Sequence, residues 1–136
     1  MLQFLENNVL TVSITFISGY MLFWSFYGNR LRGIAEVDTQ NAMNLINRQN
    51  AVVLDVREQG EYDAGHIINS RLIPTGQLKD RIGELEKYRE RPIVVVCRSG
   101  ARAAGATVFL NKQGFKPHLL AGGVMAWQKA NLPLER

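Results

Sequence analysis

An uncharged apolar segment near the start of the chain limits what the chain can form more than any other feature. Residues 9–27 (VLTVSITFISGYMLFWSFY) contain no charged side chain. As a helix that rises about 1.5 Å per residue, this segment spans roughly the 30 Å hydrocarbon core of a bilayer. The sequence therefore predicts one transmembrane helix at about residues 9–27, inside an N-terminal anchor formed by residues 1–30.

Two other interpretations of this segment remain open. A cleaved signal peptide is the first, but Glu6 and two asparagines precede the segment instead of lysines, and bulky aromatic residues end it where a cleavage site needs small ones. A buried helix of a soluble core is the second, and such a helix normally has a polar stripe, which this segment lacks. We therefore expect a membrane anchor.

The residues at the end of the segment predict an orientation. Trp24 and Tyr27 lie where an interfacial aromatic belt is expected, and Arg30 and Arg32 follow directly. By the positive-inside rule, these arginines place the rest of the chain in the cytoplasm. The one cysteine of the chain, Cys97, cannot form an internal disulfide, which is consistent with a reducing compartment.

After a linker of residues 31–37, residues 38–136 have the composition of a soluble domain that is long enough for one core. Strands that are apolar on both faces, at residues 51–56 and 93–96, alternate with helical segments. This alternation predicts an α/β fold with a mostly parallel central sheet flanked by helices. The other expected elements are helices at about 39–48, 58–64, 102–112 and 124–130, strands at 71–73 and 118–120, and a polar stretch with helical spacing at 77–88.

The charge of the chain points to anions without naming nucleic acid. Sixteen Lys and Arg against 12 Asp and Glu give a net charge of +4. No run of basic residues with interleaved aromatics is present, so we expect no nucleic-acid partner. His118 has no companions at the spacing of metal ligands, so we expect no metal and no other cofactor.

The cysteine lies at the carboxyl end of a predicted strand, which is where open α/β sheets bind ligands. Cys97 follows the strand at 93–96, and RSGAR (98–102) forms a strand-to-helix turn with a glycine. A helix N-terminus lowers the pKa of a thiol from about 8.5 by at most about two, and Arg98 and Arg102 add to this effect. A lone cysteine is more often inert core, but the arginines, the glycine and the helix start favour a reactive thiol that binds an anionic substrate.

Four stretches of the sequence resemble the rhodanese-type sulfurtransferases. CRSGAR (97–102) is similar to the family's active-site loop, in which a cysteine opens a six-residue loop closed by arginine, threonine or serine. VVLDVRE (52–58), GHI (65–67) and GGVMAW (122–127) resemble the family's Asp-x-Arg strand, Gly-His-Ile and closing Gly-Gly-x-x-x-Trp, in that order. The resemblance covers about residues 38–134. With the anchor, the chain is most similar to membrane-tethered single-domain rhodaneses of bacteria, which implies the bacterial inner membrane.

This resemblance implies an enzyme that transfers a sulfane sulfur. Cys97 would take the outer sulfur of a donor such as thiosulfate and hold it as a persulfide, and a thiol or cyanide would remove it. The amides and guanidinium groups of the loop would bind the persulfide and an oxyanion donor. The loop residues are Arg98, Ser99, Gly100, Ala101 and Arg102. Because no second cysteine exists, the acceptor must be a separate molecule, a protein persulfide partner included.

Other residues are expected to support the loop. Asp55 and Arg57 match the family segment as a hydrogen-bonded acid and an ion-paired arginine. His66 is expected to stabilise a turn, because attack by a thiolate needs no general base, and Trp127 is expected in the core. Residues 68–70 (INS) depart from the family pattern of a small or proline residue, glycine and alanine, so the turn near the substrate mouth is expected to differ in shape.

Two other functions remain possible. A related phosphatase or arsenate reductase would have arginine six residues after the cysteine, but Ala103 stands there and the arginine is Arg102. A loop that is one residue shorter suits a sulfur atom better than a tetrahedral phosphate. The other possibility is a membrane-tethered docking module with little turnover, although inactive members of the family generally lack the cysteine.

Overall fold

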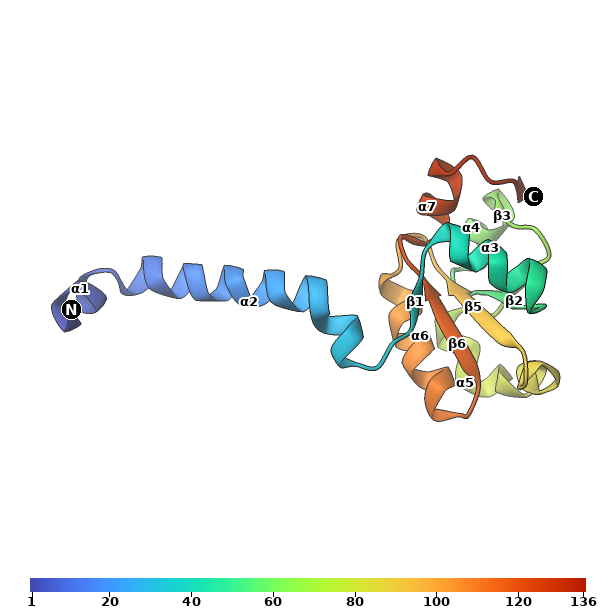
Figure 1. Cartoon of the computed structure of the whole chain (residues 1–136), viewed down its shortest axis with the longest axis horizontal. Helices are drawn as coiled ribbons and strands as arrows, with labels where there is room; N and C mark the ends of the chain where they lie inside the picture. The colour runs from blue at the N-terminus through green and yellow to red at the C-terminus, as the bar shows by residue number, and fades with distance from the viewer. The chain divides into compact units, whose positions relative to one another are not determined.

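A computed structural model gives the fold of the chain and describes residues 1–136, except for the side chain of Asn29. The chain forms two compact units, Met1–Arg32 and Gly33–Arg136. The first unit contains helices α1 (Leu2–Asn7) and α2 (Val9–Leu31), drawn in blue in Figure 1.

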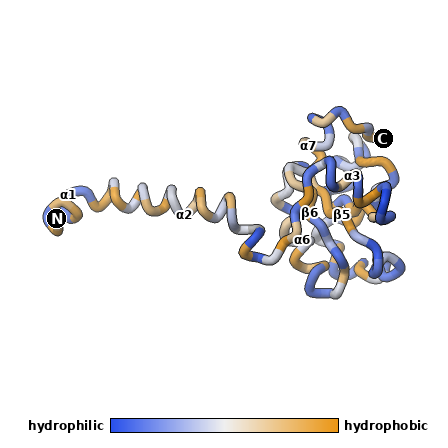
Figure 2. The backbone as a smooth tube through the Cα atoms, in the orientation of Figure 1, coloured by the Kyte–Doolittle hydropathy of each residue, from blue (hydrophilic) through white to orange (hydrophobic). Residues whose placement is uncertain are grey.

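Helix α2 contains the predicted apolar segment. Its stretch Val9–Gly28 is long and apolar enough to cross a membrane, with a mean hydropathy of 1.6. Most of its residues are apolar or of intermediate hydropathy, as the orange and white colours along α2 in Figure 2 indicate, and this stretch is not buried in the protein. Rings one turn apart pack on each other, with centroids 6.3 Å apart for Tyr20 and Trp24. A helix without a polar stripe and without a protein partner is what a single span requires.

The second unit is built on a parallel five-stranded sheet with the strand order β1-β6-β5-β2-β4. Its strands are β1 (Glu36–Val37), β2 (Val52–Asp55), β4 (Arg71–Leu72), β5 (Pro92–Val96) and β6 (Lys116–Leu120). A separate antiparallel pair joins β3 (His66–Ile67) to β7 (Leu134–Glu135). The α/β class and the parallel sheet predicted from the sequence are confirmed.

Helices cover both faces of this sheet. They are α3 (Thr39–Arg48), α4 (Gln59–Ala64), α5 (Leu78–Arg81), α6 (Ala101–Lys112) and α7 (Gly123–Lys129), with 3₁₀ segments η1 (Thr75–Gln77) and η2 (Ile82–Tyr88). Alternate strand residues point to opposite faces, so Leu54 and Val95 share a core with Leu110 of α6. Val53 and Val94 instead share a core with Ala42 of α3 and Trp127 of α7.

Most local elements follow their sequence signals. Asp38 caps α3, because its Oδ1 accepts a hydrogen bond from the Asn41 amide at 2.8 Å. The stretch predicted as helical at 77–88 is divided between α5 and the 3₁₀ segment η2. Gly83 lies in η2, and glycine weakens an α-helix by about 1 kcal/mol relative to alanine.

Strands β1 and β7 have no clear signal in the sequence. Each has two residues, which is too short for an alternating pattern. Strand β1 lies within the stretch 31–37 that the sequence suggested as a linker, and it pairs Glu36 with Leu119 and Val37 with Leu120 of β6. These short strands form because a neighbouring strand offers partners for their amides and carbonyls.

Candidate active site

The cysteine loop lies at the carboxyl end of β5, between β6 and β2 of the sheet. Cys97 follows the last residue of the strand, and Gly100 ends the turn with φ of +110° before α6 begins at Ala101. This φ lies in the left-handed region that favours glycine. The strand and the helix therefore fix both ends of the loop.

The sulfur of Cys97 accepts hydrogen bonds from two backbone amides. The Gly100 amide lies 2.9 Å from Sγ and the Ala103 amide lies 3.4 Å from it. Ala103 was not among the residues that the sequence suggested for the loop, because it belongs to the first turn of α6. Two main-chain donors directed at one sulfur stabilise negative charge on that atom.

Cys97 is also deeply buried, with 1% of its surface exposed. It packs in the core cluster that contains Val56, Val95 and Ala103. Sequence reasoning expected an accessible reactive thiol and could not indicate this burial, because the packing around the loop comes from elements far along the chain. A reagent can therefore reach the sulfur only when neighbouring residues move.

A pocket of about 340 Å³ adjoins the loop. Its walls come from α4, the turn after α4, the cysteine loop and α7. The lining residues are Arg57, Glu61, Ala64, Gly65, Arg98, Val124, Met125 and Gln128. Arg98 is exposed and forms no ion pair with the side chains that the structure describes. The pocket can accept a small anion at this guanidinium.

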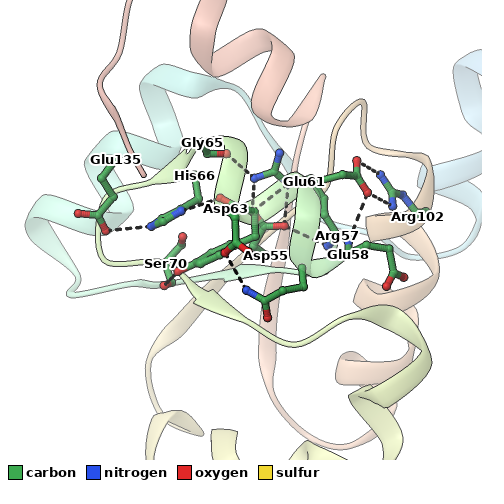
Figure 3. A network of polar contacts seen from close by, with 12 residues as sticks. Asp55, Arg57, Glu58, Glu61, Asp63, Gly65, His66, Ser70, Arg102 and Glu135 are labelled. Atoms are coloured by element: carbon green, nitrogen blue, oxygen red, sulfur yellow. Dashed lines mark hydrogen bonds and ion pairs between the residues drawn. The ribbon is translucent and has the colours of Figure 1, made fainter.

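Arg102 faces an acid that sequence reasoning missed. Its Nη1 and Nη2 donate to Oε1 and Oε2 of Glu61 in α4, at 2.7 and 2.8 Å, as Figure 3 shows. The hydrogen bond from Arg102 is the largest cause that lowers the pKa of Glu61 from 4.5 to about 2, and the same pair raises the pKa of Arg102. Unlike Arg98, Arg102 is already paired with a carboxylate.

Asp55 and Arg57 form a buried ion pair beside the pocket (Figure 3). Asp55, at the end of β2, is fully buried, and it accepts from Nε of Arg57 at 3.0 Å and from Nη2 at 2.8 Å. The Arg57 amide also donates to Asp55, and its Nη2 donates to the Gly65 carbonyl at 2.8 Å. The pair connects β2 to the turn after α4 and so supports the pocket wall.

The start of α7 closes over the cysteine loop. The Val124 amide donates to the Cys97 carbonyl at 2.8 Å, and the Met125 amide donates to the Arg98 carbonyl at 3.1 Å. A Cβ on Gly123 would lie 2.3 Å from the Cys97 carbonyl oxygen, and Gly123 has φ of +58°. Only glycine allows this close contact, so α7 can pack against the cysteine loop because residue 123 is a glycine.

His66 stabilises the turn after α4. Its ring stacks on the Tyr62 ring with centroids 3.7 Å apart, and its Nδ1 lies 2.8 Å from the Tyr62 carbonyl oxygen. Its Nε2 lies 3.3 Å from Oε1 of Glu135 in β7. With both nitrogens engaged in the fold, His66 has the structural role that the sequence predicted.

Two further expectations can be compared with the structure. Trp127 is buried as predicted, and its Nε1 donates to the Pro133 carbonyl. The turn at residues 68–70 is not among the residues that line the pocket beside the cysteine, and Ile68 and Asn69 line a different hollow. Among the described residues, no group of three or more His, Cys, Asp or Glu side chains could hold a metal.

Comparisons with known proteins show to which family this chain belongs. A sequence profile of the "Rhodanese-like domain" matches residues 38–130. The chain is 39% identical over 97 residues to the uncharacterized protein YibN of Escherichia coli K12, which is 70% of this chain and 68% of that protein. It is 30% identical over 95 residues to the thiosulfate sulfurtransferase GlpE of Pseudoalteromonas translucida, which is 69% of this chain and 89% of that protein.

A solved structure has the same fold. The crystal structure of a rhodanese-related protein from Thermoplasma volcanium matches with a TM-score of 0.68 and 31% identity, over 74% of this chain and 97% of that chain. The resemblance predicted from the sequence is thus confirmed, and the chain belongs to the family of rhodanese-like domains.

Proposed function

We propose that this protein is a sulfurtransferase that carries a sulfane sulfur on Cys97 as a persulfide. The observation that carries the proposal is the pair of amide hydrogen bonds from Gly100 and Ala103 to Sγ. A thiolate, or a persulfide in its place, needs donors to its negative charge, and main-chain donors give this without a proton transfer. Arg98 at the adjoining pocket supplies a cation for an anionic donor.

The transfer has two balanced steps. In the first, the Cys97 thiolate attacks the outer sulfur of thiosulfate, a new S–S bond forms, the donor S–S bond breaks, and sulfite leaves with the electron pair of that bond. In the second, cyanide or a thiolate attacks the terminal sulfur of the persulfide, and the Cys97 thiolate leaves. The products are thiocyanate or a new persulfide. The chain has one cysteine, so the acceptor is a separate molecule.

Access to the sulfur is part of the proposal. Cys97 is 1% exposed, so donor and acceptor reach Sγ when the turn at residues 98–100 opens away from it. The side chains of Arg98 and Ser99 are exposed, and Gly100 lies in the left-handed region, so no core packing of these two side chains opposes this movement.

We further propose that α2 anchors the domain as a single span of the bacterial inner membrane, with residues 38–136 in the cytoplasm. Support comes from the apolar stretch Val9–Gly28 and from Arg30 and Arg32 after it. A Cys97→Ser/Lys129→Cys variant tests the orientation in intact cells, because Lys129 is exposed whereas Cys97 is buried. Labelling by an impermeant thiol reagent only after the cells are opened supports the proposal, and labelling of intact cells contradicts it.

One observation favours a second candidate function. The burial of Cys97, together with the exposed Met125 at the pocket, suits a docking module that binds a partner protein without sulfur transfer. A phosphatase has less support, because Arg102 is paired with Glu61 and Ala103 stands at the signature position.

Turnover separates the two candidate functions. The full chain in detergent is incubated with thiosulfate and cyanide, and thiocyanate is measured for the wild type, Cys97→Ser and Cys97→Ala. The sulfurtransferase proposal predicts thiocyanate from the wild type alone. Equal release by all three proteins, or none from the wild type, removes the proposal and leaves the docking module.

A further inference from the structure

The three arginines around the pocket differ in how their charge is compensated. Asp55 neutralises Arg57, and Glu61 neutralises Arg102. Arg98 lines the pocket and has no carboxylate partner among the described side chains. The pocket therefore presents one uncompensated positive charge. The sequence had suggested that the guanidinium groups of both Arg98 and Arg102 bind the donor.

The Glu61 carboxylate also faces the pocket. Glu61 belongs to the pocket lining, and 32% of its side chain is exposed. Its hydrogen bond to Arg102 keeps its pKa near 2, so it stays ionised at neutral pH. A ligand in the pocket thus meets the Glu61 carboxylate as well as the Arg98 guanidinium. A second negative charge on that ligand is repelled by Glu61 and gains no free cation.

The rest of the wall carries no charge. Ala64 and Gly65 come from the end of α4, and Val124, Met125 and Gln128 come from α7. Met125 is 40% exposed, so its thioether and methyl group are available to an uncharged part of a ligand. One unpaired arginine, one carboxylate that is already ion-paired and an otherwise uncharged wall fit a ligand with a single negative charge beside an apolar group.

We propose that Glu61 is a specificity-determining residue that makes this enzyme select sulfur donors with one negative charge over dianionic donors. The proposal rests on the sulfur transfer proposed above. The substrate class is a monoanionic sulfane donor, in which an uncharged group takes the place of one charged oxygen of thiosulfate. Glu61 acts by holding Arg102 and by repelling the second charge.

A pair of donors that differ in this one feature tests the proposal. Thiosulfate has two negative charges, and methanethiosulfonate has a methyl group in place of one charged oxygen. Each donor gives the Cys97 persulfide when its S–S bond breaks, and the leaving group that keeps the electron pair is sulfite or methanesulfinate. The quantity to compare is the ratio of kcat/KM for the two donors, with cyanide as acceptor.

Glu61→Gln removes the charge and keeps the local fold. Glu61 is the N3 residue of a capping box in α4, in which its Oε1 accepts from the Glu58 amide, and glutamine serves equally well in that position. We expect kcat/KM for thiosulfate to rise about fivefold, the factor that one unit charge at about 4 Å contributes in water. We expect kcat/KM for methanethiosulfonate to rise only about twofold, because its single negative charge interacts with the Glu61 carboxylate about half as strongly as the two charges of thiosulfate do.

Glu84→Gln is the matched control. Glu84 also pairs with an arginine, Arg81 in α5, but neither residue lines the pocket. This control is expected to leave the donor ratio unchanged. A Glu61→Gln enzyme with an unchanged ratio, or with equal gains for both donors, overturns the proposal.

A binding measurement on the wild-type chain decides the question without sulfur transfer. Sulfate and methanesulfonate differ as the two donors do but contain no sulfane sulfur, and titration calorimetry of the full chain in detergent gives their affinities. The proposal predicts that methanesulfonate binds at least as tightly as sulfate, and tighter sulfate binding overturns it. If neither donor forms a persulfide, the proposed function fails, whereas this binding order stands or falls alone.

Discussion

The guanidinium of Arg102 and the carboxylate of Glu61 form two hydrogen bonds, of 2.7 and 2.8 Å, between residues 41 positions apart in the chain. The pair joins α4, which follows β2, to α6, which follows β5. Because β2 and β5 are neighbours in the parallel sheet, their carboxyl ends bring these two helices together. The ion pair is therefore a consequence of the topology, and it places a paired carboxylate in the lining of the pocket.

This ion pair predicts a pH dependence of stability. Folding lowers the pKa of Glu61 from 4.5 to about 2, chiefly through the hydrogen bond from Arg102, so the unfolded chain binds more protons between these values. The stabilisation is complete above pH 4.5 and is lost as the pH falls towards 2. Urea unfolding of the wild type and Glu61→Gln, followed by circular dichroism, should give a difference in unfolding free energy that shrinks over this range. A difference that stays constant from pH 6 to pH 3 contradicts the assignment.

The buried pair of Asp55 and Arg57 predicts a large loss of stability. Arg57→Met leaves a fully buried carboxylate without its partner, and we expect the free energy of unfolding to fall by about 3–5 kcal/mol. The double variant Asp55→Asn/Arg57→Met removes both charges and should lose less than the single variant. Chemical denaturation measures both values.

A surface pair provides the control for this prediction. Arg81→Met breaks the exposed pair with Glu84 and should change the stability little. Equal losses for Arg57→Met and Arg81→Met would show that burial does not set the strength of the Asp55–Arg57 pair.

The contact between Gly123 and the cysteine loop predicts a specific effect of one methyl group. In Gly123→Ala, the new Cβ would lie 2.3 Å from the Cys97 carbonyl oxygen at φ of +58°, so either α7 or the loop must move. We expect a loss of about 2–4 kcal/mol from overpacking and backbone strain, and a lower rate of sulfur transfer. Thermal unfolding and the thiocyanate assay measure the two effects.

Gly60→Ala is the matched control, because Gly60 lies in α4 with no atom within 4 Å of a new Cβ. Alanine favours the helix there, so stability should be unchanged or higher by up to about 1 kcal/mol. If both glycine variants melt at the wild-type temperature and transfer sulfur at the wild-type rate, α7 does not hold the loop as described.

The parts of the fold that could be predicted are those with a local cause. The strands around Val53 and Val94 are apolar on both faces, and only a sheet covered by helices buries both faces. Asp38 and the helix after it form a local capping signal. The Cys97 loop could be placed at the end of a strand because its neighbours in sequence are also its neighbours in space.

The parts that could not be predicted depend on contacts between distant residues. Arg102 was expected to bind the donor, but its partner Glu61 is known only once β2 and β5 are side by side. The burial of Cys97 likewise depends on packing in the folded core. Strand β1 forms because it can pair with the edge of β6, and the two residues of β1 alone do not indicate this pairing.

Intact-protein mass spectrometry shows whether Cys97 carries a sulfur atom. The full chain in detergent is incubated with thiosulfate or methanethiosulfonate, and its mass is measured before and after cyanide is added. We predict that the wild type gains the mass of one sulfur atom and loses it to cyanide, while Cys97→Ser and Cys97→Ala gain nothing. No gain by the wild type with either donor, or the same gain by the cysteine variants, would contradict the account.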